Sequence, residues 1–329
     1  MCGDEMQLEG KTIILTGGAG FIGSQLTKRL APKNRVIIYD NLHRNALQYS
    51  DPGCSPDLTV VHGDVLDRDK LIGATRGCDI LVHLAAIAGV DTVMEMPTHT
   101  MKVNLLGTLN ALDAAVDAGV KRFVDFSTSE VFGSHVYMAE EHDATALGVV
   151  GESRWTYAVS KLAAEHLVSS YHKEKGLETV TIRPFNVYGP QQVGVGAIHT
   201  FVVDALMDRD LVVHGEGNQI RSWCYVDDMV DGALLCLEKD EAIGHVFNIG
   251  NPRATVTVAN LALLVRRLCC SNSRIVYGYK DYVDVELRIP SIKKAQALLG
   301  YWPKVDLEDG LARTIDWYRK QLDDQTDQA

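Results

Sequence analysis

The residues best suited to chemistry form two short groups in the middle of the chain. Tyr157 and Lys161 have the spacing Y-x-x-x-K within a segment of helical pattern. Positions i and i+4 share one face of a helix, so the lysine ammonium would lie one turn from the phenol. A nearby cation lowers the pKa of a phenol, and a phenolate can remove the proton of a substrate hydroxyl. The pair therefore predicts a base that acts on an alcohol.

The second group is Ser127-Thr128-Ser129-Glu130, directly after an apolar run that predicts a strand. In open parallel sheets, ligands bind at the carboxyl ends of the strands. There Thr128 can hydrogen-bond the reacting oxygen, and the Glu130 carboxylate can remove a proton from carbon. This group therefore indicates chemistry beyond a simple oxidation of an alcohol.

The surrounding sequence predicts the elements that would position these groups. Short apolar runs at 11–16, 35–40, 58–62, 79–84, 122–126 and 178–183 alternate with helical segments at 20–30, 97–118 and 153–175. Apolar strands separated by helices predict an α/β fold with a doubly wound parallel sheet of Rossmann type. After Pro184 glycine and polar residues become denser. We therefore expect a cofactor domain at 1–183 and a smaller mixed α/β substrate domain at 184–329, with segments that interleave.

A glycine-rich turn joins the first predicted strand to the first predicted helix. Gly17, Gly20 and Gly23 have the spacing G-x-x-G-x-x-G, with Phe21 and Ile22 between the last two. Such a turn lets the backbone approach a pyrophosphate closely, at a helix N-terminus that favours anions. The context predicts a dinucleotide site.

Asp40 ends the second predicted strand, where a carboxylate can bind both ribose hydroxyls and would repel a 2′-phosphate. It favours NAD over NADP, although Arg44 nearby leaves NADP open. Further residues at the strand ends are expected to line the cofactor: Asn41, Asp64, Val65, Leu84, Ala85 and Ala86. For Asp64, a local turn or cap role is equally compatible with the pattern.

Composition excludes several classes of protein. The 329 residues carry a net charge of −11, with 46% hydrophobic and 23% charged residues, as in globular proteins. This acidity disfavours nucleic-acid binding, which needs clustered Lys and Arg. The seven cysteines show no C-x-x-C spacing, so neither a metal site nor a disulfide framework is expected. With no apolar leader and no membrane-length apolar run, we expect a cytoplasmic protein.

Taken together, the motifs resemble the extended short-chain dehydrogenase/reductases, in particular the nucleotide-sugar epimerase/dehydratase group. The matching segments are TGGAGFIG at 16–23, HLAA at 83–86, Asn104 with Gly107-Thr108, STSEVFG at 127–133, RWTYAVSK at 154–161, RPFNVYGP at 183–190, IRSWCYVDD at 220–228 and NIGNP at 248–252. The resemblance implies bound NAD, a nucleotide-diphosphate sugar as substrate and a homodimer built on helices near 97–118 and 153–175. It also implies Tyr157 as base, Lys161 as its partner and Thr128 as hydroxyl ligand, with Asn186, Arg221 and Arg288 near the substrate.

The same resemblance leaves the reaction open after a shared oxidation of the sugar C4 hydroxyl to a ketone. A 4-epimerase returns hydride to the other face. A 4,6-dehydratase removes the C5 proton and the C6 hydroxyl, and a uronate decarboxylase loses carbon dioxide. Thr-Ser-Glu is similar to GDP-mannose dehydratases and UDP-glucuronate decarboxylases, and RWTYAVSK is similar to the decarboxylases.

Two residues guide the choice among these reactions. Gln191 stands where uronate-processing members often have arginine, although Gln192, His199 or Arg154 could replace that charge. Ser129 stands where glucose dehydratases usually carry an aspartic acid. We expect a neutral NDP-hexose 4,6-dehydratase, with the 4-epimerase and the decarboxylase as alternatives. A non-catalytic nucleotide-sugar sensor is disfavoured because Thr128, Tyr157 and Lys161 are all present.

Overall fold

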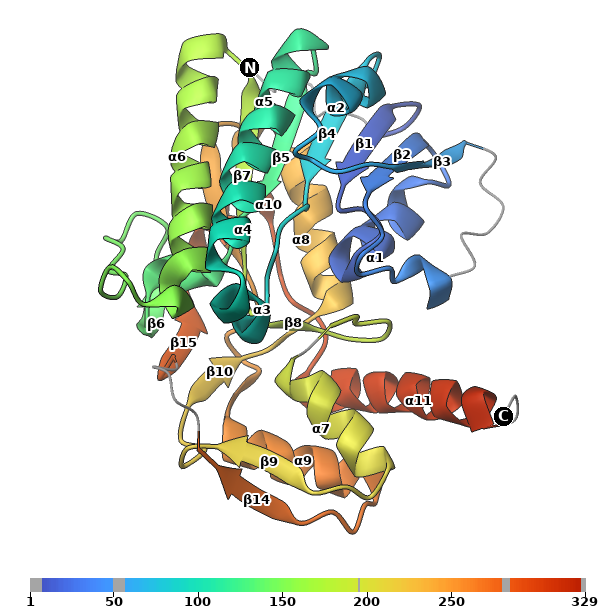
Figure 1. The fold of residues 1–329 in the computed structure, drawn as a ribbon, viewed down its shortest axis with the longest axis vertical. Coiled ribbons are helices and arrows are strands. Elements are labelled where there is room, and N and C mark those ends of the chain that lie inside the picture. Colours follow the sequence, from blue (N-terminus) through green and yellow to red (C-terminus); the bar gives the residue numbers. More distant parts are fainter. Residues whose placement is uncertain (1–7, 50–56, 195, 280–284, 327–329) are drawn as a thin grey trace.

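The computed structural model describes residues 8–49, 57–194, 196–279 and 285–326, with side chains as far as residue 324. Figure 1 shows a sheet flanked by helices, with a smaller part built from the later sequence beneath it. The start of the chain, on which the expectation of no leader rests, lies outside the described residues.

Within the described residues, a seven-stranded sheet has the order β12-β7-β5-β4-β1-β2-β3, and every neighbouring pair is parallel. Its strands are β1 Thr12–Thr16, β2 Arg35–Asp40, β3 Leu58–His62, β4 Ile80–His83, β5 Arg122–Phe126, β7 Glu178–Pro184 and β12 His245–Ile249. The order reverses direction on either side of β1, as in doubly wound sheets. The predicted α/β fold is confirmed.

Helices cover both faces of this sheet (Figure 1). Apolar side chains of one face pack against α2 (Arg68–Thr75), α5 (Gly107–Asp117) and α6 (Thr156–Lys175), and those of the other face pack against α1 (Phe21–Leu30) and α8 (Val226–Glu238). Strands buried on both sides must be apolar throughout, which explains the continuous runs in the sequence. No helix of the described residues is both long enough and apolar enough to cross a bilayer.

The two long helical segments predicted from sequence differ in regularity. The first is divided into α4 (Pro97–Met101), a wider π-helical turn η2 (Lys102–Leu106) and α5; α3 (Val90–Glu95) precedes it. In the wide turn, Asn104 is buried, and its amide bonds both backbone groups of Ile87 and the Ser160 hydroxyl of α6. The second runs as the short turn η4 (Ser153–Trp155) and then α6, as predicted.

The remaining elements, most of them from the later part of the chain, form smaller sheets, helices and short turns. Their bounds are β6 His135–Ala139, β8 Val187–Tyr188, β9 Leu211–His214, β10 Ile220–Ser222, β11 Cys224–Tyr225, β13 Thr255–Thr257, β14 Ile275–Gly278, β15 Leu287–Pro290, α7 Ala197–Leu206, α9 Val258–Cys269, α10 Lys293–Leu299 and α11 Leu307–Thr326, with short turns η1 Leu47–Tyr49, η3 Ser129–Phe132 and η5 Asp240–Ala242.

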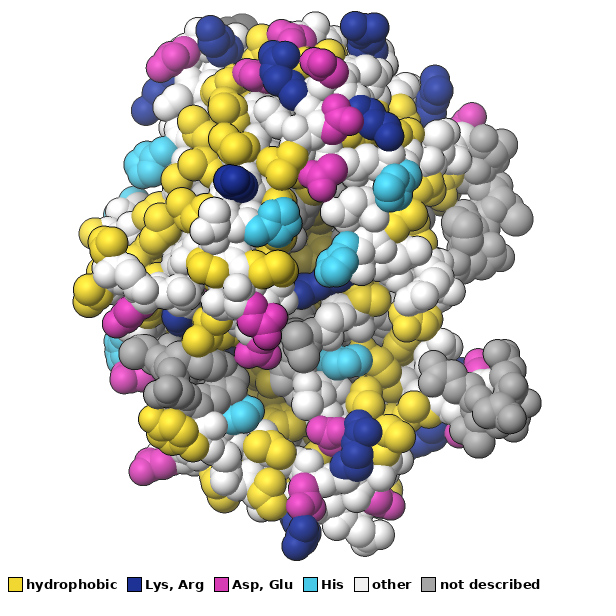
Figure 2. Space-filling model, in the orientation of Figure 1, with side chains coloured by type: hydrophobic (Ala, Val, Ile, Leu, Met, Phe, Trp, Pro, Cys, Tyr) yellow, Lys and Arg dark blue, Asp and Glu magenta, His cyan; other side chains and the backbone are white. Residues whose placement is uncertain are grey.

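The two parts of the chain interleave. Strand β6, from the first half, joins the sheet β13-β10-β15-β6, whereas β12 and α8, from the second half, pack in the large sheet's layers. A single division at 183/184 stays a prediction. Figure 2 shows the surface hollowed where the two parts meet, and on this face the described Lys and Arg side chains are scattered among Asp and Glu.

Candidate active site

The glycine turn between β1 and α1 is packed backbone against backbone. Gly17 has a φ of +72°, and a Cβ there would lie 2.6 Å from the Ala85 nitrogen. A Cβ on Gly23 would lie 2.6 Å from the Gly17 carbonyl oxygen. Helix α1 begins at Phe21 with Gly20 as its N-cap, and no side chain bonds its first N–H groups. The start of α1, which has no side-chain cap, thus lies beside a turn whose backbone can be approached closely, as a pyrophosphate site requires.

Asp40 lies directly beside this turn. One carboxylate oxygen accepts the Ala19 N–H at 3.0 Å, and the other accepts the Leu42 N–H at 2.7 Å. Burial raises the pKa of Asp40, against the lowering effect of the two N–H groups. The carboxylate is thus fixed at the carboxyl end of β2, the position from which a ribose is bound in such folds.

The remaining cofactor candidates lie along the same edge. Asp64 accepts the Leu66 N–H at 2.9 Å, so its carboxylate closes a local turn, which was one of its two expected roles. Val65 is buried and packs against Gly107, where a Cβ would lie 2.6 Å from its methyl group. Leu84 donates its N–H to Thr16, and Ala85 and Ala86 follow directly beside the glycine turn.

Two side chains beyond Asp40 have partners of their own. The Asn41 side chain accepts the N–H of His43 at 3.1 Å. Arg44 reaches the start of α3, where it donates to the Thr92 hydroxyl at 3.5 Å and lies over Gly89. The guanidinium that could have bound a 2′-phosphate is therefore directed at α3.

Tyr157 and Lys161 lie on the first two turns of α6, below the carboxyl end of β5. The Thr128 side chain hydrogen-bonds the Tyr157 hydroxyl. Burial raises the pKa of Tyr157, the Glu130 carboxylate raises it further, and the bond from Thr128 opposes both. Lys161 is 1% exposed, and its Nζ lies 3.7 Å from Asp125 Oδ1. Thr128 thus lies against the predicted base, and Lys161 follows it one turn later on α6. The expectation that a nearby cation lowers the pKa of Tyr157 is wrong, because burial and the neighbouring carboxylates raise it.

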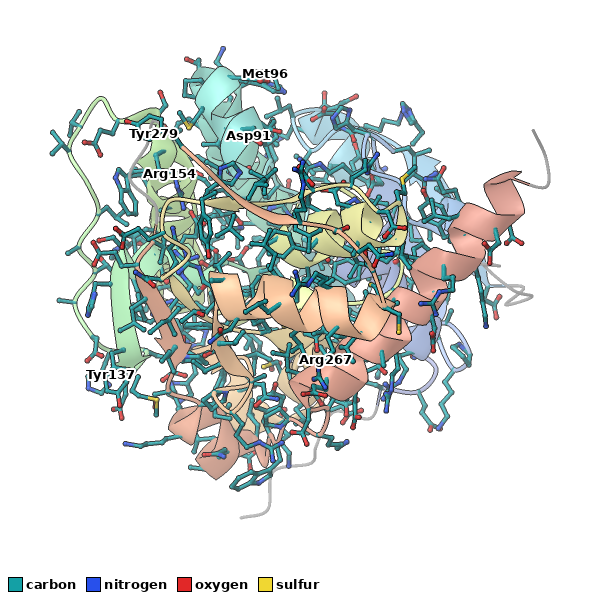
Figure 3. All side chains as sticks on the ribbon, turned by 90° about the horizontal axis from the view of Figure 1, so that it is seen from below. Asp91, Met96, Tyr137, Arg154, Arg267 and Tyr279 are labelled. Carbon is teal, nitrogen blue, oxygen red and sulfur yellow. The ribbon has the colours of Figure 1, made fainter. Side chains whose placement is uncertain are left out.

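Glu130 is held by two buried arginines. Arg154 Nη1 lies 2.7 Å from one carboxylate oxygen and Nη2 lies 3.2 Å from the other, a bidentate pair. Arg288 Nη1 lies 3.5 Å from Glu130 as well. Burial alone would raise the pKa of Glu130, but Arg288 and Arg154 lower it below its ordinary value. Figure 3 shows Arg154 inward of Tyr137, which projects at the edge of the molecule.

This geometry changes the expectation for Glu130. A carboxylate with a lowered pKa and two guanidinium partners is a weak base toward carbon. Ser129 lies beside it in η3 and is buried. The structure thus combines one anion and two cations next to the Tyr157 phenol.

The other substrate candidates hold the later strands together. Asn186 donates to the Ser222 carbonyl at 2.8 Å from a left-handed backbone (φ +38°). Arg221 is buried and donates to the carbonyls of Ile220 and Val285. Arg288, one strand away on β15, pairs with Arg221 in the sheet register but directs its guanidinium at Glu130.

Gln191 and its neighbours lie against other elements. The Gln191 side chain accepts from Gln25 and Lys28 of α1 and donates to the Tyr49 carbonyl. Because the Gln191 side chain is held by α1 and by Tyr49, its neutrality does not bear on whether the substrate carries a carboxylate.

Gln192 and His199 are joined through Tyr318 of α11. The Tyr318 hydroxyl donates to the Gln192 carbonyl at 2.9 Å, so it accepts from His199 Nδ1 at 2.7 Å. Burial lowers the pKa of His199. Among the described residues, neither side chain contacts Glu130 or Tyr157, so their substrate roles stay predictions.

Two buried features behind the site were not anticipated. Glu165 of α6 binds Ser127 and receives a bidentate pair from Arg183 at 2.9 and 2.7 Å. Asp125 lies fully buried beside Lys161. The signal in the sequence was Asp125 between Val124 and Phe126 of β5, because a parallel strand buried on both faces is normally apolar at such a position.

A family model described as the NAD dependent epimerase/dehydratase family matches residues 13–250. The chain belongs to this family. A UDP-N-acetyl-alpha-D-glucosaminuronate decarboxylase of Bacillus cytotoxicus is 32% identical over 320 residues, covering 94% of this chain and 98% of the relative. A dTDP-glucose 4,6-dehydratase of an Actinoplanes species is 32% identical over 318 residues, covering 93% and 97%.

Solved structures of the NAD dependent epimerase/dehydratase family share the fold. A UDP-glucuronic acid 4-epimerase from Bacillus cereus, in complex with UDP-glucuronic acid and NAD, superposes with a TM-score of 0.85 at 29% identity, covering 94% of this chain and 99% of that one. The chain is thus an NAD-dependent enzyme of the group that contains nucleotide-sugar dehydratases, epimerases and decarboxylases. These three relatives carry out three different reactions.

Proposed function

We propose that the chain is an NAD-dependent decarboxylase of a nucleotide-activated hexuronic acid. The observation that supports this proposal most strongly is that two buried arginines, Arg154 and Arg288, form ion pairs with Glu130. This cluster lies beside Tyr157 and Thr128. The summed charge of the cluster is positive, which favours a sugar that brings a carboxylate of its own. Bidentate arginine is the side chain best matched to that group.

The lowered pKa of Glu130 supports the same choice. A 4,6-dehydratase needs a base strong enough to take the C5 proton. A decarboxylase needs none, because the electrons that form the enolate come from the C5–carboxyl bond. A Glu130 carboxylate that is ion-paired with Arg154 and Arg288, and orients both, is consistent with decarboxylation.

The chemistry of this chain's residues follows in steps. Tyr157 takes the proton of the C4 hydroxyl while Thr128 hydrogen-bonds that oxygen. NAD held at the glycine turn would supply the acceptor for the C4 hydride and the donor that returns it at the end. The resulting β-keto acid breaks its C5–carboxyl bond, carbon dioxide leaves, and the electron pair moves to the C4 oxygen. The protonated Tyr157 can donate to that enolate oxygen, and C5 then takes a proton.

We assign the cofactor to the cradle formed by Gly17, Gly20 and Gly23, with Asp40 on the adenosine ribose. The N–H groups at the start of α1 would face the pyrophosphate. Lys161 would face the nicotinamide ribose. A Gly17→Ala substitution would place a methyl group against Ala85, so it should weaken NAD binding without altering the Glu130 cluster.

A 4,6-dehydratase is the second candidate, because Glu130 follows Thr128 in the same turn and a related dehydratase matches nearly the whole chain. It would require Glu130 to leave the arginines during turnover. A 4-epimerase would need only Thr128, Tyr157 and Lys161.

The mass of the product distinguishes these reactions. The purified protein would be incubated with NAD and UDP-glucuronate, UDP-N-acetylglucosaminuronate, UDP-glucose, dTDP-glucose or GDP-mannose, with Tyr157→Phe as control. We expect loss of carbon dioxide from a uronate. Loss of water from a neutral hexose would replace this proposal by the dehydratase, and a new product of unchanged mass would replace it by the epimerase.

We also propose a homodimer formed through α5 and α6. Leu106 at the end of η2, Val116 of α5 and Val159 of α6 have 45%, 38% and 41% of their surface exposed. A second copy would cover them. Light scattering should give twice the chain mass of 36.1 kDa, and Val159→Glu should shift it to the monomer.

A further inference from the structure

We propose that Asp125 is a positioning residue for the Tyr157–Lys161 pair: its carboxylate holds the Lys161 ammonium and sets the pH range in which Tyr157 acts as base. Asp125 is 0% exposed and Lys161 is 1% exposed, and Lys161 Nζ lies 3.7 Å from Asp125 Oδ1. The inference rests on the proposed role of Tyr157 as base in C4 oxidation. It does not depend on which reaction follows.

Strand alternation shows why the position is unusual. Val124 and Phe126 pack into the core on the α1–α8 face, and Phe123 packs on the face covered by α5 and α6. Asp125 therefore shares the face of Phe123, where packing calls for an apolar side chain. Replacing a buried ion pair by apolar residues is often neutral or stabilising, so stability does not explain a carboxylate here.

Charged neighbours on the other elements have different partners. Glu165 of α6 is paired with Arg183 of β7. On β4, His83 is held between the Thr16 and Thr108 hydroxyls, and burial lowers its pKa to about 3, so it is neutral. Glu130 is paired with Arg154 and Arg288.

Lys161 is therefore the cation left for Asp125. Among the described residues it is the only cation within ion-pair distance of Asp125, and neither Asp125 oxygen has a hydrogen-bond partner there. The carboxylate acts on Lys161 and, through space, on the Tyr157 phenol.

The direction of the effect follows from charge. A negative charge favours the protonated form of every neighbouring acid, whether phenol or ammonium. Removing it with Asp125→Asn should lower the pKa of Tyr157, because the Asp125 carboxylate is one of the charges that raise it. The limb of the pH profile that reports Tyr157 should move to lower pH, by about one unit, rather than merely fall in height.

The first test needs no substrate. The ionisation of Tyr157 is followed in NAD-loaded protein as the difference in phenolate absorbance between each variant and the same variant with Tyr157→Phe. We expect a lower midpoint in Asp125→Asn and in Asp125→Leu. The control is Asp240→Asn, which removes a carboxylate 2.6 Å from buried Arg122 at the opposite end of β5 and should leave the midpoint unchanged. Equal midpoints in all proteins would overturn the proposal.

A stability cycle covers the case in which the single Asp125 variants do not fold. Lys161→Met leaves Asp125 buried without a cation, so it should destabilise the protein strongly. Adding Asp125→Asn to Lys161→Met should restore stability. A double variant no more stable than Lys161→Met would show that the two groups are not a pair and would end the proposal.

A kinetic profile then relates the pair to turnover. With the sugar nucleotide that is turned over, the limb of the kcat profile that reports Tyr157 should move to lower pH in Asp125→Asn. A drop in kcat at an unchanged profile would assign Asp125 a packing role only. Absence of turnover with every sugar would count against the proposed function, while the substrate-free titration would still decide the role of Asp125.

Discussion

Glu130 and Asp125 are carboxylates on one short segment that runs from β5 into η3, and both are largely buried, yet their environments act in opposite directions. Glu130 has two guanidinium partners, and its pKa is lowered. Asp125 has a single ammonium at 3.7 Å, and burial raises its pKa despite Lys161. Burial alone thus does not decide the charge of an acid. The number of cations and the geometry of their hydrogen bonds decide it.

Both carboxylates act on the same phenol. Each raises the pKa of Tyr157, and the Thr128 hydroxyl and Arg288 oppose them. The Glu130 cluster includes Arg154 and Arg288, which we assign to the proposed sugar site. Asp125 and Lys161 instead form a pair that is almost fully buried. We therefore expect changes at Glu130 to alter which sugar reacts and changes at Asp125 to alter the pH at which any sugar reacts.

Removing the phenol should have the largest effect, because both clusters act through it. Tyr157→Phe should lower turnover by about a thousandfold, in the range that general-base removal costs. Retention of NAD, measured by its absorbance after gel filtration, should be unchanged. Near-normal turnover in this variant would show that Tyr157 is not the base. The effects of Glu130 and Asp125 on this phenol would then have no bearing on catalysis.

Arg154 should have the next largest effect, and only on the sugar side. Arg154→Met removes a bidentate partner, so uronate turnover should fall about a hundredfold, as expected for a lost charged hydrogen-bond pair. Arg154→Lys keeps the positive charge but loses the bidentate hydrogen bonds of the guanidinium. Its uronate turnover should lie between those of wild type and Arg154→Met. These rates would be measured with a uronate and a neutral hexose nucleotide. An equal loss for both sugars would mean that Arg154 only supports the fold.

Glu130→Gln should have a smaller effect on chemistry. Because decarboxylation needs no base at C5, carbon dioxide release should persist within about tenfold of the wild-type rate. C4 oxidation should also persist. Complete loss of C5 exchange with deuterated water, with C4 oxidation intact, would instead identify Glu130 as the C5 base and favour the dehydratase.

The contrast also shows which parts could be predicted from sequence. The parallel sheet and the glycine turn follow from local patterns, because buried strands must be apolar and Gly17 has no room for a side chain beside Ala85. Tyr157, Lys161 and Thr128 followed from spacing and from their place after a strand.

The partners of Glu130 did not follow from local pattern. Arg154 precedes α6 and Arg288 lies on β15, so their meeting depends on how distant segments pack. For Gln191 the local motif was misleading. Its position in the motif indicated a place near the sugar, but its side chain hydrogen-bonds Gln25 and Lys28 of α1. The sequence shows that Asp125 is an acid within a strand expected to be buried. It does not show that Lys161 of α6 is the cation that pairs with it.

The smallest effects should appear in stability, with opposite signs for the two carboxylates. The folded pKa of Glu130 lies below its unfolded value, so the advantage of wild type over Glu130→Gln is present above about pH 4.5 and is lost as pH falls through the folded pKa. The folded pKa of Asp125 lies above its unfolded value. Wild type should therefore gain on Asp125→Asn as pH falls through that folded pKa toward about pH 4.

Urea unfolding of the three proteins between neutral pH and about pH 3 measures the sign of both trends. Because each variant is compared with wild type at the same pH, titration of the remaining acids cancels to first order. Trends of the same sign would mean that Lys161 stabilises the Asp125 carboxylate as fully as two arginines stabilise Glu130. The difference between the clusters would then lie in their position alone, and Asp125 would still be ionised wherever Tyr157 works.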